Sequence, residues 1–217
     1  MAMPALITLS QPRSAAAEAY RSLRTNLMFS SVEKPIKTLL VTSAAREDHK
    51  SATLANLAVT FAQGGNRTIL VDADLRQPQQ HTIWTLENQR GLSQMMVDDA
   101  ALKDPPLQDS PVDNLQLLCT GELPPNPADL LGGKRMSDII AALKQRADYV
   151  LFDSPPVLAA TDAALLGIKL DAALLAVRAG DTRRDHTAQA RQALERVHVR
   201  IVGAVLTNAP RENQVAY

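Results

Sequence analysis

Lys50 and Ser51 are neighbouring side chains that could bind the phosphates and the magnesium ion of a nucleotide. They follow an apolar run that begins at Thr38 and a charged segment, and they precede apolar residues at helical spacing. This order predicts a strand, a loop and a helix. A phosphate-binding loop keeps its lysine and its magnesium-binding hydroxyl at the start of such a helix, where backbone N–H groups attract anions. The glycines usual in such a loop are missing.

Three aspartates follow predicted buried strands and could contact a ligand. Asp72 and Asp74 come at the end of the apolar run 68–71, and Asp153 ends the run that starts at Tyr149. Ligands of open α/β sheets bind at the carboxyl ends of strands, so we expect these carboxylates to face one crevice. Two residues apart on an extended chain, Asp72 and Asp74 point to the same side. A turn or helix-cap carboxylate is the alternative interpretation, chiefly for Asp74.

Buried strands alternate with helices along most of the chain. We expect interior strands at 39–43, 68–72, 149–153, 171–177 and 201–206, and helices that include 14–29, 136–146 and 184–197. This alternation predicts a doubly wound α/β fold with a mostly parallel central sheet and helices on both faces. A length of 217 residues with 46% hydrophobic composition suits a single domain, residues 1–217, with an N-terminal arm at 1–13 and a short tail at 209–217.

The middle of the chain carries less information. Trp84, Met95 and Met96 are interpreted as core residues, and residues 98–111 as a polar, proline-containing surface loop. Cys119 ends the apolar run 115–119. A lone thiol cannot form an internal disulfide, so we expect a packed strand residue in a reducing cytosol.

Composition argues against several classes of function. The 23 basic and 23 acidic side chains leave no net charge, which disfavours binding to nucleic acid or to an anionic membrane surface. No apolar run approaches the ~20 residues of a membrane helix, and no signal peptide is visible, so we expect a cytoplasmic protein. The four histidines show no metal-ligand spacing, which predicts no zinc site: His49, His81, His186 and His198.

Several motifs together resemble the bacterial tyrosine kinases (BY-kinases) of capsule and exopolysaccharide assembly. These motifs are Thr42-Ser43-Ala44, Lys50-Ser51, Asn56-Leu57-Ala58, the segment 69–76, the segment 121–131 and Asp153-Ser154-Pro155-Pro156. BY-kinases belong to the deviant-P-loop ATPases, which include the MinD and ParA proteins. The resemblance runs from about Ser14 to Asn208, and it implies a P-loop NTPase-like fold.

The resemblance also implies roles for individual residues. Lys50 would clamp phosphates, Asp72 would accept the tyrosyl proton, and Asp74 would join them as a catalytic residue. Magnesium would be bound by Ser51, Asp72 and Asp153, and the implied cofactor is Mg-ATP or Mg-ADP. The tail is expected to be phosphorylated at Tyr217. The implied nucleotide-binding residues are Arg46, Glu47, Asp48, His49, Lys50, Ser51, Ala52 and Asn208.

The first predicted helix carries Glu18, Arg21 and Arg24 at a spacing of three residues. From spacing alone this is a solvated face with one helical ion pair. The resemblance implies instead the motif through which BY-kinases join neighbouring subunits, and hence a ring-like homo-oligomer. It further implies a membrane polysaccharide co-polymerase or activator protein as partner, which would recruit this chain to the inner face of the membrane.

The loop departs from the family pattern. Arg46 stands in place of proline, Glu47 and His49 in place of glycines, Asp48 in place of glutamate and Ala52 in place of threonine. Glycines let the main chain approach phosphate oxygens closely, and a side chain at either position obstructs that approach. A glutamate near the polyphosphate costs about 3 kcal/mol at ~5 Å and an effective dielectric of ~20. We therefore expect nucleotide binding to be impaired.

Three hypotheses follow. The preferred one is a BY-kinase-like pseudokinase, a scaffold of polysaccharide biosynthesis and export that binds nucleotide weakly or not at all. The first alternative is an active, ATP- and magnesium-dependent protein-tyrosine autokinase, favoured by the retention of Lys50, Ser51 and the three aspartates. The second alternative is a MinD- or ParA-like positioning ATPase.

Overall fold

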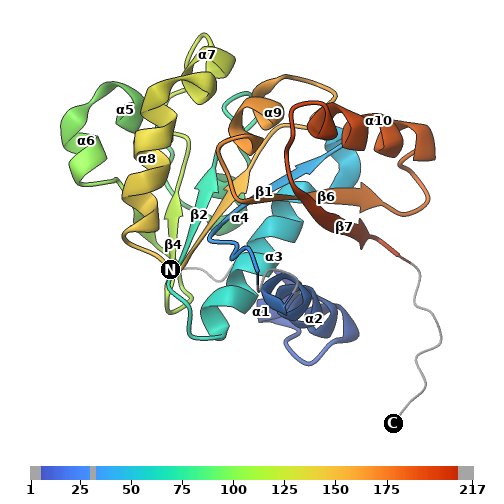
Figure 1. The fold of residues 1–217 in the computed structure, drawn as a ribbon. Coiled ribbons are helices and arrows are strands. Elements are labelled where there is room, and N and C mark those ends of the chain that lie inside the picture. Colours follow the sequence, from blue (N-terminus) through green and yellow to red (C-terminus); the bar gives the residue numbers. More distant parts are fainter. Residues whose placement is uncertain (1–5, 30–32, 210–217) are drawn as a thin grey trace.

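The computed structural model describes residues 6–29 and 33–209 (Figure 1). Seven strands in these residues form one sheet in the order β3-β4-β2-β5-β1-β6-β7. All neighbouring pairs are parallel except β3 with β4. The strands are β1 (Thr38–Ser43), β2 (Thr68–Asp72), β3 (Gln108–Asp109), β4 (Leu115–Leu118), β5 (Tyr149–Asp153), β6 (Ala172–Arg178) and β7 (Ile201–Thr207).

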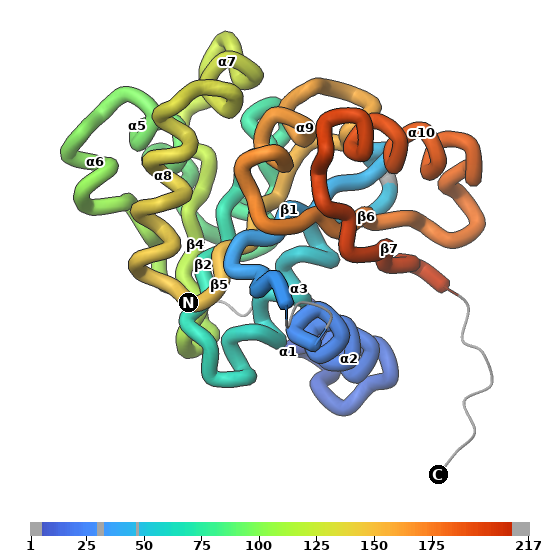
Figure 2. The backbone as a smooth tube through the Cα atoms, in the orientation of Figure 1, coloured from blue at the N-terminus to red at the C-terminus, as the bar shows by residue number. Residues whose placement is uncertain are grey.

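Helices cover both faces of the sheet. On one face lie α1 (Ile7–Ser10), α2 (Ala15–Phe29), α3 (Lys50–Gln63) and α4 (Gln80–Trp84). The other face is covered by α5 (Leu92–Val97), α6 (Asp99–Lys103), α8 (Lys134–Lys144), α9 (Asp162–Gly167) and α10 (Arg184–Glu195). The short helix α7 (Pro127–Gly132) lies beside α9. Figure 2 shows α8 and α10 on one side of the strands, with α1, α2 and α3 on the other.

The interior strands are continuous apolar runs because side chains on both of their faces are buried. Every residue of β1 and of β2 is buried. Alternate residues supply two separate cores: Leu40 and Phe152 face the core under α8 and α9, whereas Leu39 and Leu151 face α3. The doubly wound, mostly parallel fold expected from the sequence is therefore confirmed.

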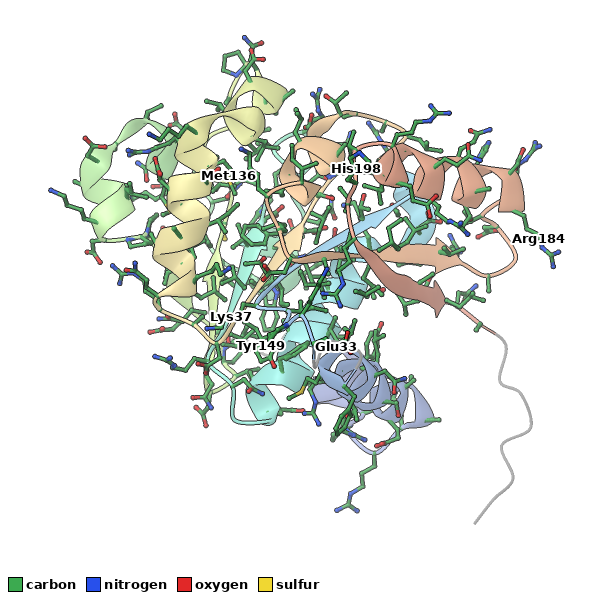
Figure 3. All side chains as sticks on the ribbon, in the orientation of Figure 1. Glu33, Lys37, Met136, Tyr149, Arg184 and His198 are labelled. Carbon is green, nitrogen blue, oxygen red and sulfur yellow. The ribbon has the colours of Figure 1, made fainter. Side chains whose placement is uncertain are left out.

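Helix α3 is almost entirely buried, and both Leu54 and Leu57 are inaccessible to solvent. The ring of Phe61 packs against Tyr149 of β5, with ring centroids 4.5 Å apart and planes tilted by 45°. Tyr149 is labelled in Figure 3, where side chains fill the space between the sheet and the helices. This packing fixes α3, and with it the position of Lys50 at its start.

Two segments are more regular than the sequence indicates. Part of the expected N-terminal arm forms α1, which is held against α3 because Thr8 N and Thr8 Oγ1 both donate to Asn56 Oδ1, at 3.0 and 2.9 Å. The loop expected at 98–111 is wrong in part, since it contains α6 and the short strand β3. Asp98 caps α6 by accepting from Ala100 N at 2.8 Å, and helix-forming residues follow it.

The expected core residues are confirmed: Trp84, Met95, Met96 and Cys119 are all buried. Burial raises the pKa of the Cys119 thiol to about 12, so this cysteine stays a neutral packing residue at physiological pH. Within the described part of the chain, no helix combines the length and the apolar character needed to cross a membrane.

Candidate functional site

The carboxyl ends of three adjacent strands create the site. Asp72 of β2 and Asp153 of β5 are direct partners in the parallel register, and β1 lies on the other side of β5. The chain leaves β1 through a loop containing a 3₁₀ turn, η1 (Arg46–Asp48), and enters α3 at Lys50. Both aspartates therefore lie at the strand ends that face the loop, as in other open α/β sheets.

The ammonium group of Lys50 lies among three oxygen atoms of the site. Its Nζ is 3.0 Å from Asp74 Oδ2, 3.3 Å from Asp153 Oδ1 and 3.2 Å from Ser51 Oγ. All four residues are buried. Burial by itself lowers the pKa of Lys50, but the charges of Asp153 and Asp74 outweigh it, so the pKa is raised and the lysine stays charged.

Asp72 has different contacts from Asp74. Its Oδ2 accepts from the backbone N–H groups of Gln79 and Gln80, at 3.0 and 2.8 Å, where α4 begins. Its Oδ1 accepts from Asp74 N at 3.3 Å. Burial, and then the charge of Asp153, raises the pKa of Asp72 to about 8. Asp74 has both contacts: its Oδ2 accepts from Lys50 Nζ, and its Oδ1 accepts from Gln77 N at 3.0 Å and from Arg76 N at 3.4 Å. The turn role that the sequence left open for Asp74 is therefore present beside its contact with Lys50.

The charges and donor atoms of this cluster fit a magnesium ion. When ionised, Asp74 and Asp153 carry two negative charges against the one positive charge of Lys50, and Asp72, with its raised pKa, adds a third only when it loses its proton. Carboxylate and hydroxyl oxygens are the ligands that Mg²⁺ prefers, and it commonly binds one or two carboxylates together with substrate phosphates. No cluster of acidic, histidine and cysteine residues in the described ranges makes a metal site by itself, so the phosphates would complete the coordination.

The loop keeps a glycine-like backbone without a glycine. His49 has φ 57° and ψ 29°, a left-handed conformation that costs a residue with a Cβ roughly 1–2 kcal/mol. Asp48 is buried, and its carboxylate accepts from Ala45 N at 2.9 Å, from Arg178 N at 3.4 Å and from Thr182 Oγ1. The Asp48 side chain thus connects the loop to the end of β6 and to the segment after it, and it holds a turn for which glycines are normally used.

A cavity of about 520 Å³ opens beside Lys50. Its lining consists of Arg46, His49, Lys50 and Ser51 from the loop, and Asp74, Arg76, Gln77, Gln79, Pro155, Pro156 and Ala159 from the opposite wall. Arg76 is fixed by a two-bond ion pair, at 2.8 and 3.0 Å, to Asp162, which is fully buried.

Other predicted nucleotide-binding residues lie elsewhere. The half-buried Ala52 belongs to the first turn of α3 and does not line the cavity. Asn208 is exposed just beyond β7, with φ 53°. The side chain of Glu47 and all of Tyr217 lie outside what the structure describes.

The residues predicted for self-association lie on α2. Arg21 forms an ion pair with Glu18 at 2.7 Å within the helix. Arg24 instead donates from Nη1 to Thr60 O at 2.7 Å, near the end of α3. The same side chain is therefore used to pack α2 on α3.

Sequence reasoning missed Gln80 and overlooked its link to Trp84, which was interpreted only as a core residue. Gln80 is fully buried and donates from Nε2 to Asp153 Oδ2 at 2.8 Å. Its Oε1 accepts from Trp84 Nε1 at 3.2 Å. The only sequence signal was a glutamine and a tryptophan four residues apart, shortly after the aspartates.

Known proteins share both sequence and fold with this chain. No protein-family model matches it. It is 39% identical to the tyrosine-protein kinase YwqD of Bacillus subtilis over 93% of this chain and 84% of that protein. It is 33% identical to the putative tyrosine-protein kinase CapB of Staphylococcus aureus over 95% of this chain and 90% of that protein.

Solved protein structures are also similar to this chain. The kinase domain of the Escherichia coli tyrosine kinase ETK superposes with a TM-score of 0.90 at 30% identity, covering 100% of this chain and 84% of that one. MinD from Pyrococcus horikoshii, solved with Mg-ADP, has a TM-score of 0.68 at 20% identity over 82% of this chain and 72% of that one, which shows a shared fold alone. The chain belongs to the bacterial tyrosine-protein kinase family.

Proposed function

We propose that this chain binds a magnesium-nucleotide in the Lys50 cavity and transfers a phosphoryl group to tyrosine, in the service of capsule or exopolysaccharide assembly. The supporting observation is the cluster in which Lys50 Nζ meets Asp74, Asp153 and Ser51 within 3.3 Å. An abandoned site would be expected to lose such a cluster, because buried charges are costly to keep.

Each residue has a part in this proposal. Mg-ATP, when bound, supplies the phosphoryl group and the cation that offsets its charge. Ser51 and Asp153 are placed to hold that cation, and Lys50 must leave its carboxylate partners to reach the phosphates. Asp74 lines the cavity and Asp72 does not, so Asp74 is the carboxylate in position to accept a proton from a tyrosyl hydroxyl.

A scaffold that lacks catalysis is the second candidate, and the loop favours it. His49 lines the cavity where the family has a glycine, and Glu47 adds a negative charge to the loop. On this proposal the chain assembles through Glu18 and Arg21 of α2 and works through its contacts with other proteins. A MinD-like positioning role has only the shared fold in its favour.

We also propose a membrane polysaccharide co-polymerase as partner, which would hold this chain at the inner face of the membrane. A chimerical protein, CapA2B2, has a solved structure that superposes with a TM-score of 0.90 at 30% identity, over 95% of this chain and 90% of that one. This proposed partner is inferred from membership of the family, and no surface of the described residues is used to identify it.

Phosphotyrosine formation tests the proposed activity. The purified chain would be incubated with Mg-ATP, alone and with a partner's cytoplasmic segment, and blotted for phosphotyrosine beside Lys50→Met and Tyr217→Phe. We expect a signal that Lys50→Met abolishes and Tyr217→Phe reduces. If neither the wild type nor the variant Glu47→Gly/His49→Gly/Ala52→Thr gives a signal although the variant binds Mg-ADP, the scaffold is the correct function.

A further inference from the structure

Gln80 connects residues of the candidate site that are far apart in sequence. Its side-chain Nε2 donates to Asp153 Oδ2 at 2.8 Å and to the backbone carbonyl of Ser51 at 3.1 Å. Its backbone N–H donates to Asp72 Oδ2 at 2.8 Å. One buried residue at the start of α4 therefore touches the end of β2, the end of β5 and the start of α3.

Trp84 determines which way the Gln80 amide faces. The indole N–H can only donate, and it donates to Gln80 Oε1 at 3.2 Å. A flipped amide would place two donors against each other and would turn the carbonyl oxygen toward the carboxylate of Asp153. The NH₂ group of Gln80 must therefore face Asp153 and Ser51.

This orientation divides the two oxygens of Asp153 between different tasks. Oδ2 is bound by Gln80, whereas Oδ1 faces Lys50 Nζ at 3.3 Å. The bond to the Ser51 carbonyl also fixes the first turn of α3, which carries the Ser51 hydroxyl. Such outer partners orient the ligands of metal sites and affect metal affinity.

We propose that Gln80, held by Trp84, is a positioning residue that orients Asp153 and the first turn of α3 for a cation at the nucleotide site. The inference rests on the proposed function, because it requires that a cation binds together with nucleotide. It predicts a specific loss of cation affinity when the Gln80 amide is removed, with the rest of the site left in place.

Two variants separate positioning from general stability. Gln80→Met keeps most of the side-chain volume and the backbone bond to Asp72 but removes both amide contacts. Trp84→Phe keeps an aromatic ring and removes the donor that orients the amide. Thr60→Val is the matched control, because it removes a buried hydroxyl, which donates to Leu57 O at 2.7 Å, at the far end of α3.

The measurements are the dissociation constant of Mg²⁺ at saturating ADP and the dissociation constant of ADP without a cation, both followed with a fluorescent ADP analogue. We expect Gln80→Met to weaken Mg²⁺ binding by about tenfold or more and to change cation-free ADP binding by less than about twofold. Trp84→Phe should shift the Mg²⁺ constant in the same direction by less, and Thr60→Val should leave both constants unchanged.

Trp84 also gives an independent signal, because it is the only tryptophan. Addition of Mg²⁺ to the ADP complex should change its emission in the wild type and not in Gln80→Met. Wild-type Mg²⁺ affinity in a folded Gln80→Met, or an equal loss of cation-free ADP binding, would overturn the positioning role while the proposed function stands. A wild type that binds nucleotide without any effect of Mg²⁺, or no nucleotide at all, would overturn both.

Discussion

Replacement of Lys50 by methionine should increase the affinity of the site for Mg²⁺ in the absence of nucleotide. In the structure the ammonium occupies the space between Asp74 Oδ2, Asp153 Oδ1 and Ser51 Oγ, at 3.0, 3.3 and 3.2 Å. These are oxygen atoms suited to Mg²⁺. Lys50 and a cation at this position exclude each other, so removal of the ammonium vacates the place and leaves the negative charge that attracts a cation.

The expected magnitude follows from burial. Asp153 is fully buried and Asp74 is 3% exposed, and removal of one partner of a buried ion pair typically costs about 3–5 kcal/mol. We expect Lys50→Met to lower the free energy of unfolding by about this amount without Mg²⁺. A concentration of Mg²⁺ at about 100 times its dissociation constant should then restore roughly 2.7 kcal/mol, whereas the wild type without nucleotide should respond little.

Urea unfolding followed by circular dichroism, with and without Mg²⁺, measures both effects. Lys144→Met is a suitable control, because Lys144 forms a partly exposed pair with Asp171 at 3.8 Å, and such pairs contribute about 0–1 kcal/mol. Equal stabilisation of wild type and Lys50→Met by Mg²⁺ would refute the reasoning. A loss of less than about 1 kcal/mol in Lys50→Met would also contradict the buried pairing.

Three further predictions concern other parts of the molecule. Because the pKa of Asp72 is raised from 3.8 to about 8, the native state keeps a proton that the unfolded state releases. The free energy of unfolding should therefore fall by up to about 1.4 kcal/mol per unit as pH rises from ~4 to ~8, and Asp72→Asn should remove this slope in urea titrations. Arg76→Ala should cost about 1–3 kcal/mol in the same assay, because it leaves the buried carboxylate of Asp162 without its partner; an unchanged midpoint would show that water replaces the guanidinium. Arg21→Ala should reduce the mass measured by light scattering if α2 joins subunits, whereas Arg191→Ala, in an exposed pair on α10, should not; equal masses would leave α2 as a solvated face.

The sheet could be predicted because its interior strands have a recognisable sequence pattern. Parallel strands covered on both faces have to be continuous apolar runs, and β1, β2 and β5 are such runs, each with a polar residue as its last. Placing Asp72 and Asp153 in one crevice needed only this topology. The helix α1 could not be predicted, because four residues have little helical stability alone and depend on the bonds from Thr8 to Asn56.

The detailed contacts of the aspartates could not be predicted either. The chain turns directly after Asp72, so both carboxylates accept backbone N–H groups, Asp72 from Gln79 and Gln80 and Asp74 from Gln77. Asp74 in addition accepts from Lys50 Nζ. Strand periodicity places both side chains on one side and cannot distinguish them. Asp48 contacts Arg178 and Thr182, which are 130 and 134 residues further along the chain. No local sequence pattern indicates contacts over such distances.

The central claim is that the cluster around Lys50 is a retained magnesium-nucleotide site. Anomalous diffraction from crystals grown with Mn²⁺ and ADP, at the manganese absorption edge, tests it most directly. We expect one manganese peak within coordination distance of Ser51 Oγ and on the Oδ1 side of Asp153, with Lys50 Nζ moved from the carboxylates to the β-phosphate. ADP bound without a manganese peak at this place, or Lys50 still paired with Asp74 and Asp153 beside bound Mn-ADP, would contradict the account.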